Sequence, residues 1–172
     1  VYGAISPGQF MPIAEGAGLD AALGAWVLHR ACADLARLRA TGPATRDLAV
    51  HVNLSAGQLA DPRLPRVVVA AAAAAGVPLA ALVLEVTETA LAMHPDHAVG
   101  PLAALRATGV RLALDDFGTG YSSLAALARL PLDVLKIDRR FVADLREPGR
   151  AADLACTVLR LGTTLGLATV AE

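Results

Sequence analysis

The stretch Val110–Asp116, VRLALDD, places two adjacent carboxylates directly after a short apolar run. Gly109 ends the helical pattern before it, so the run is typical of a strand that is buried on both faces of a parallel sheet. Helical patterns separate this run from similar apolar runs at residues 48–53, 82–86, 134–138 and 168–172. This alternation predicts an α/β fold in which right-handed crossovers join parallel strands.

Polar side chains occur at the C-terminal end of each predicted strand: Asn53, Glu85, Asp115 with Asp116, Lys136, and Glu172. An open doubly wound sheet usually concentrates its site at one switch point, whereas a barrel collects groups from many strand ends at one face. The pattern therefore favours a TIM-like (β/α) barrel. A complete barrel needs eight strands and about 250 residues, so about five of the eight strands are expected here and the barrel is incomplete in this chain.

Composition excludes several classes of function. The 172 residues include 15 basic and 16 acidic side chains, for a net charge of −1, which argues against a DNA or RNA duplex partner or a polybasic membrane patch. Hydrophobic residues form 55% of the chain, so it is not disordered. The most apolar run, Val67–Ala75, is too short to span a bilayer. We expect a cytoplasmic domain in which Cys32 and Cys156 are buried free thiols.

Local signals predict several helices and the places of single residues. Ser6 and Gln9 fit a capping box, a long helix is expected over residues 19–40, and Asp61 is expected to cap the next helix. Further helices are expected near residues 95–109, from Ser122 or Ser123 to Pro131, and over 150–165. Trp26 is interpreted as a core residue. His51 shares the strand parity of Asn53, which indicates an inward core histidine or one that supports a ligand.

The strand-end residues form an oxygen-rich set, in which carboxylates would repel one another without a cation. Oxygen ligands without His or Cys suit Mg²⁺ or Mn²⁺. The adjacent Asp115 and Asp116 are spaced to bridge two ions about 3.5–4 Å apart, as in two-metal phosphodiester chemistry. Lys136 adds a cation for an attacking water or a phosphate. The alternative is a set of helix caps and salt bridges at strand ends.

Longer motifs resemble one family, the EAL-domain cyclic di-GMP phosphodiesterases. Residues 115–124, DDFGTGYSSL, resemble its most specific loop. Further segments are similar to its other motifs: QFMPIAE at 9–15, VNLS at 52–55, LEVTE at 84–88, LDVLKIDRRF at 132–141 and VAE at 170–172. The resemblance covers essentially the whole chain and implies a TIM-like barrel that hydrolyses cyclic di-GMP to linear pGpG.

The resemblance also implies roles for individual residues. Asn53, Glu85 and Asp115 would be metal ligands, and Asp116 would serve the second metal of a two-metal Mg²⁺ or Mn²⁺ site. Lys136 would contact the catalytic water. Glu88 would steady the loop from Phe117 to Tyr121, and Glu172 would take part in metal–water chemistry.

The chain departs from the family pattern because it lacks the EAL motif itself. We expect that motif upstream of Val1 and the last strands after Glu172, so residues 1–172 are expected to be a phosphodiesterase domain truncated at both ends and inactive alone. The parent protein is expected to carry sensor or diguanylate-cyclase-like domains; a homodimer and a membrane anchor stay open. A non-catalytic cyclic di-GMP receptor or scaffold is the alternative, and the presence of Asn53, Asp115 and Lys136 favours the enzyme.

Overall fold

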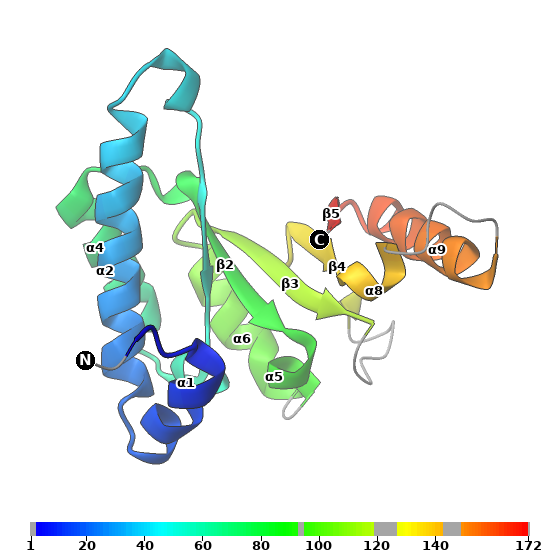
Figure 1. The fold of residues 1–172 in the computed structure, drawn as a ribbon, viewed down its shortest axis with the longest axis horizontal. Coiled ribbons are helices and arrows are strands. Elements are labelled where there is room, and N and C mark those ends of the chain that lie inside the picture. The colour runs from blue at the N-terminus through cyan, green and yellow to red at the C-terminus, as the bar shows by residue number, and fades with distance from the viewer. Residues whose placement is uncertain (1–2, 93–94, 119–126, 143–148, 172) are drawn as a thin grey trace.

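The computed structural model describes residues 3–92, 95–118, 127–142 and 149–171. In that part of the chain, strands alternate with helices, as the sequence predicts (Figure 1). The strands are β1 (Val50–Asn53), β2 (Leu82–Thr87), β3 (Arg111–Phe117), β4 (Val134–Ile137) and β5 (Ala168–Ala171). The helices are α1 (Pro7–Gly16), α2 (Asp20–Arg39), α3 (Ala56–Ala60), α4 (Leu64–Ala75), α5 (Glu88–Ala92), α6 (Pro95–Arg106), α8 (Arg139–Val142) and α9 (Arg150–Thr164), with 3₁₀ turns at Pro43–Thr45 and Leu79–Ala81.

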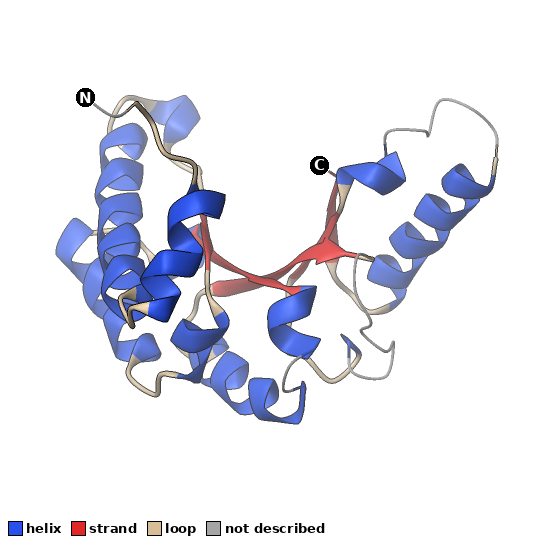
Figure 2. Cartoon of the chain, turned by 60° about the horizontal axis from the view of Figure 1, so that its bottom comes forward, coloured by secondary structure: helices blue, strands red, loops and turns tan. Residues whose placement is uncertain are grey.

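The strands form one sheet in the order β1-β2-β3-β4-β5, and every ladder in the described residues is parallel. Each strand therefore pairs with the next strand along the chain, which is the order of a (β/α) barrel. Figure 2 shows the curved strands with helices around their outer side. The predicted α/β class and parallel sheet are confirmed.

The two faces of the sheet differ in what they bury. Alternate strand residues, among them Leu84, Leu112 and Leu135, join the large core beneath the helices. The residues between them form a second, small cluster of Val83, Ala113 and Val134. We call the face that carries this small cluster the inner face. Its next residues toward the strand ends are polar, so the apolar floor of the inner face lies beneath polar groups.

Helix α2 corrects the prediction for Trp26. The buried residues of this helix are Gly24, Leu28, Cys32 and Leu35, which form one stripe against the core. Trp26 lies two residues from both Gly24 and Leu28, which turns it to the opposite side of the helix, and it is 63% exposed. The prediction of a core tryptophan is therefore wrong.

Other local predictions are corrected in detail. Ser6 is the N-cap of α1 but makes no side-chain cap hydrogen bond, so the predicted box is absent. The N-cap of α4 is Arg63, so the prediction that Asp61 caps this helix is wrong by two residues; the Asp61 carboxylate instead accepts a hydrogen bond from the Arg63 backbone N–H. Both cysteines are free, but only Cys32 is buried, which raises the pKa of its thiol; Cys156 is exposed.

Three short helices, α3, α5 and α8, begin within three residues of the ends of β1, β2 and β4 and were not predicted. The helix expected from Ser122 or Ser123 starts outside the described residues. None of the described helices combines the length and the hydropathy that crossing a membrane requires.

The contact between α2 and α3 depends on a glycine. Ser55 and Gln58 form a reciprocal capping box at the start of α3, in which the Gln58 amide accepts a hydrogen bond from the Ser55 N–H at 3.0 Å. The same buried amide lies against Gly24, where a Cβ would overlap it. Because the box holds the amide in place, Gln58 has no easy way to move aside.

We predict that Gly24→Ala lowers the free energy of unfolding. Overpacking costs about 1–3 kcal/mol, which exceeds the gain in helix propensity of about 0.5–1 kcal/mol. Urea unfolding followed by circular dichroism measures the change. Gly8→Ala is the control, because Gly8 is also within a helix, α1, but a Cβ there would meet only Oγ of Ser6 at an ordinary 4.0 Å. The packing argument fails if both variants are equally stabilised.

Candidate active site

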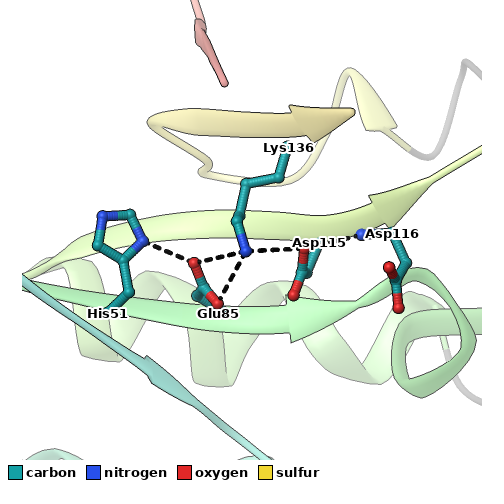
Figure 3. A network of polar contacts seen from close by, with 5 residues as sticks. All are labelled: His51, Glu85, Asp115, Asp116 and Lys136. Atoms are coloured by element: carbon teal, nitrogen blue, oxygen red, sulfur yellow. Dashed lines mark hydrogen bonds and ion pairs between the residues drawn. The ribbon is translucent and has the colours of Figure 1, made fainter. Parts of the chain in front are cut away.

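Lys136 lies at the centre of a polar network on the inner face (Figure 3). Its ammonium is 3.0 Å from Oε1 of Glu85 and 3.0 Å from Oδ1 of Asp115, and it donates to Oε2 of Glu85 at 3.1 Å. The side chains of Lys136, Glu85 and Asp115 are only 9%, 5% and 13% exposed. Charges with so little water around them are costly unless they are paired, so the ammonium of Lys136 pairs with both carboxylates and offsets part of their negative charge.

The strand register brings these groups to one end of the sheet. Glu85 comes from β2, Asp115 from β3 and Lys136 from β4. Asn53, the last residue of β1, is the register partner of Glu85. Register partners in a parallel ladder extend from the same face, so the exposed Asn53 amide lies beside Glu85 on the inner face.

A β-bulge accounts for the position of the two adjacent aspartates. Leu114 pairs with Leu135, but Phe117 pairs with Ile137, so β3 contains one more residue than β4 across this interval. Asp115 and Asp116 together therefore lie opposite Lys136. Asp116 has a φ of 55°, and its N–H donates to Oδ1 of Asp115 at 3.0 Å. Bulges change the direction of side chains in this way and are frequent beside active sites.

Glu88 holds the start of the loop that follows β3. It is the first residue of α5, is 1% exposed, and accepts a hydrogen bond from the Gly118 N–H at 3.0 Å. Gly118 has a φ of 96°, and a Cβ there would lie 2.5 Å from the ring of Phe141. The backbone at Gly118 is thus fixed between the carboxylate of Glu88 and the ring of Phe141.

The donor chemistry of this site suits a hard divalent cation. Carboxylate oxygens of Glu85 and Asp115 already converge on one ammonium, and the Asn53 amide lies in the same row. Within the described residues, however, no group of three or more His, Cys, Asp or Glu side chains is arranged to hold a metal ion. A cation here would therefore need the amide oxygen of Asn53 or groups beyond those residues.

Comparison with known proteins identifies the family. Residues 2–172 match the sequence model of the EAL domain. The chain belongs to the EAL domain family. The cyclic di-GMP phosphodiesterase NbdA of Pseudomonas aeruginosa is 43% identical over 170 residues, which cover 99% of this chain and 22% of NbdA. An uncharacterized signaling protein of Caulobacter vibrioides is 44% identical over 170 residues, which cover 99% of this chain and 20% of that protein.

Solved EAL structures share the fold of this chain. The phosphodiesterase PaMucR, in a complex with c-di-GMP, matches with a TM-score of 0.87 and 42% identity over 98% of this chain and 72% of its own. The EAL domain of Mycobacterium smegmatis DcpA matches with a TM-score of 0.82 and 38% identity over 90% of this chain and 68% of its own. Such EAL domains are TIM-like barrels, so the predicted fold is confirmed for a partial chain.

Two residues close to Gly118 and Asp116 were not singled out in the sequence analysis. Phe141 ends the motif-like segment at 132–141, and its ring packs against Gly118 at the start of the loop. Arg140 donates to Oδ1 of Asp138 at 3.0 Å. Hydrogen bonds from Arg140 lower the pKa of Asp138. In turn, the Asp138 carboxylate raises the pKa of Arg140, and the charge of Asp116 raises it further. The consecutive arginines after Asp138 are the signal that was available.

The structure thus brings Glu85, Asp115 and Lys136 into contact and puts Asn53 beside them. Asp116 is connected to them through its backbone N–H, and Glu88 accepts a hydrogen bond from the loop backbone at Gly118. Glu172 and Tyr121 lie outside the described residues.

We predict that Gly118→Ala destabilises the EAL domain more than Gly109→Ala. The two glycines have nearly equal φ values of 96° and 100°, so the backbone strain of about 1–3 kcal/mol is shared. Gly109 would meet only an ordinary contact with Leu79, whereas Gly118 adds the overlap with Phe141. Thermal and urea unfolding measure the difference. Equal losses would contradict a role for the ring in seating the loop.

Proposed function

We propose that this EAL domain is part of a phosphodiesterase that hydrolyses one phosphodiester bond of cyclic di-GMP to linear pGpG. The observation that carries the proposal is the contact of Lys136 with Glu85 and Asp115 at the strand ends of the inner face. Two relatives, NbdA and MucR, are cyclic di-GMP phosphodiesterases, and PaMucR forms a complex with c-di-GMP; both facts support the choice of substrate.

We further propose that Asn53, Glu85 and Asp115 hold a divalent cation, Mg²⁺ or Mn²⁺, and that Asp116 serves a second one. These residues supply only oxygen donors, the kind that both ions prefer. When bound, the ions would offset phosphate charge and acidify a water molecule.

Lys136 has a separate part in the proposed reaction. Its short contacts with two carboxylates hold the ammonium in a fixed place, where it orients the attacking water and stabilises charge that develops on the phosphate oxygens. Glu88 keeps the loop at Gly118 in position. For Glu172 we retain the role that the family resemblance implies, in the handling of the water.

The proposal extends to the protein that carries this chain. The chain spans only 20%, 22% and 25% of three of its curated relatives, and one of them, MucR of Pseudomonas aeruginosa, is a bifunctional diguanylate cyclase/phosphodiesterase. We propose that residues 1–172 belong to one EAL unit that is joined to sensor or cyclase-like domains.

The direct test is an assay of the full-length protein with cyclic di-GMP and Mg²⁺ or Mn²⁺, followed by chromatography of the products. We expect pGpG from the wild-type protein and none from Glu85→Ala or Asp115→Ala. Binding of cyclic di-GMP without hydrolysis by the wild-type protein would support the receptor alternative instead.

We predict that Lys136→Ala lowers turnover by about 10²–10³-fold and weakens binding of cyclic di-GMP much less, because the ammonium acts on charge that develops during the reaction. Steady-state kinetics and calorimetric binding measure the two effects separately. Circular dichroism must confirm folding, since the variant leaves Glu85 and Asp115 without this cation. Equal losses in turnover and affinity would point to a simple phosphate clamp.

We predict that Asn53→Ala weakens the binding of Mg²⁺ or Mn²⁺ and that excess metal partly restores activity. The reason is that the variant removes one neutral oxygen donor but leaves the carboxylates of Glu85 and Asp115. Metal titrations of activity measure the shift. If the wild-type and variant curves coincide, Asn53 is not a ligand.

A further inference from the structure

His51 contacts the polar network from the side opposite Lys136. It lies on β1, two residues before Asn53, and its Nδ1 is 2.6 Å from Oε1 of Glu85 (Figure 3). Lys136 reaches the same carboxylate from β4, so Glu85 is held from two directions. The histidine side chain is 42% exposed, which means that it contributes little to the core.

The direction of this hydrogen bond follows from the charge on Glu85. The Lys136 ammonium lies within 3.1 Å of both oxygens of Glu85, so the two side chains form an ammonium–carboxylate ion pair. An ionised carboxylate only accepts hydrogen bonds, so Nδ1 of His51 must carry the proton and donate it.

Lys136 alone is a poor support for Glu85, because the same ammonium also contacts Asp115 and, in the proposed function, acts on the water and the phosphate. The bond from His51 comes from another strand, β1, and does not depend on the ammonium. Hydrogen bonds of this kind hold a metal-binding carboxylate in the orientation that the ion needs.

We propose that His51 is a positioning residue, whose Nδ1–H orients the Glu85 carboxylate toward a divalent cation. The inference rests on the proposed function, in which Glu85 is a ligand. The Nδ1 of His51 is directed at Glu85, so this nitrogen acts on the carboxylate and not on the cation.

The test measures Mn²⁺ affinity in the full-length protein without substrate, by electron paramagnetic resonance of free Mn²⁺. His51→Ala is expected to weaken Mn²⁺ binding about 10–100-fold, the usual effect of removing a partner that orients a ligand. His51→Asn should recover most of the affinity, because the nitrogen of its amide is as many bonds from the backbone as Nδ1. His51→Gln, whose amide extends further, should not. Unfolding midpoints of the three variants should stay near that of the wild-type protein.

Glu85→Ala separates the two ways in which the inference can fail. If Glu85→Ala weakens Mn²⁺ binding and His51→Ala does not, the positioning role is wrong and the proposed function stands. If neither variant changes Mn²⁺ affinity, Glu85 is not a ligand and both proposals fall. Equal weakening in the Ala, Asn and Gln variants would overturn the role of the Nδ1–H.

Discussion

The polar end of the sheet depends on one buried ammonium, that of Lys136. Glu85 and Asp115 lie at the ends of neighbouring strands, where two carboxylates shielded from water would repel each other. Lys136, from the next strand, contacts both and offsets that repulsion. The contact therefore joins β2, β3 and β4 through side chains at the end of the sheet, in addition to the backbone ladders. A fold that places carboxylates together at strand ends needs a nearby positive charge to offset their repulsion, and here Lys136 supplies it.

The division of the sheet into two faces gives this network its place. Residues such as Leu84 and Leu135 face the helices, and the residues that alternate with them form the inner face. A shift of one residue would send the carboxylates into the helix-covered core, so the apolar pattern also fixes the polar one. The bulge in β3 is the single exception in the described ladders, and it falls where two acids follow each other.

The strands and their polar ends were predictable, because short apolar runs that end in Asn53, Glu85 or Lys136 leave a clear pattern. The β-bulge in β3 was not predictable, because one additional residue in a strand leaves the apolar pattern of the sequence unchanged. The prediction for Trp26 was wrong because the apolar residues of α2 do not by themselves show which side of the helix packs against the core. Ser6 and Ser55 both precede a glutamine by three residues, yet only Ser55 forms the box, since Gln58 is also held against α2.

The sequential strand order has a consequence for the conformational entropy of the site. Glu85 and Lys136 are 51 residues apart in the chain, and His51 and Glu85 are 34 apart. On their own, such contacts would have to close long loops of disordered chain. The ladders between successive strands already close those loops, one crossover at a time. The polar groups thus meet without a further loss of chain freedom, and only the ordering of their own side chains opposes the contact.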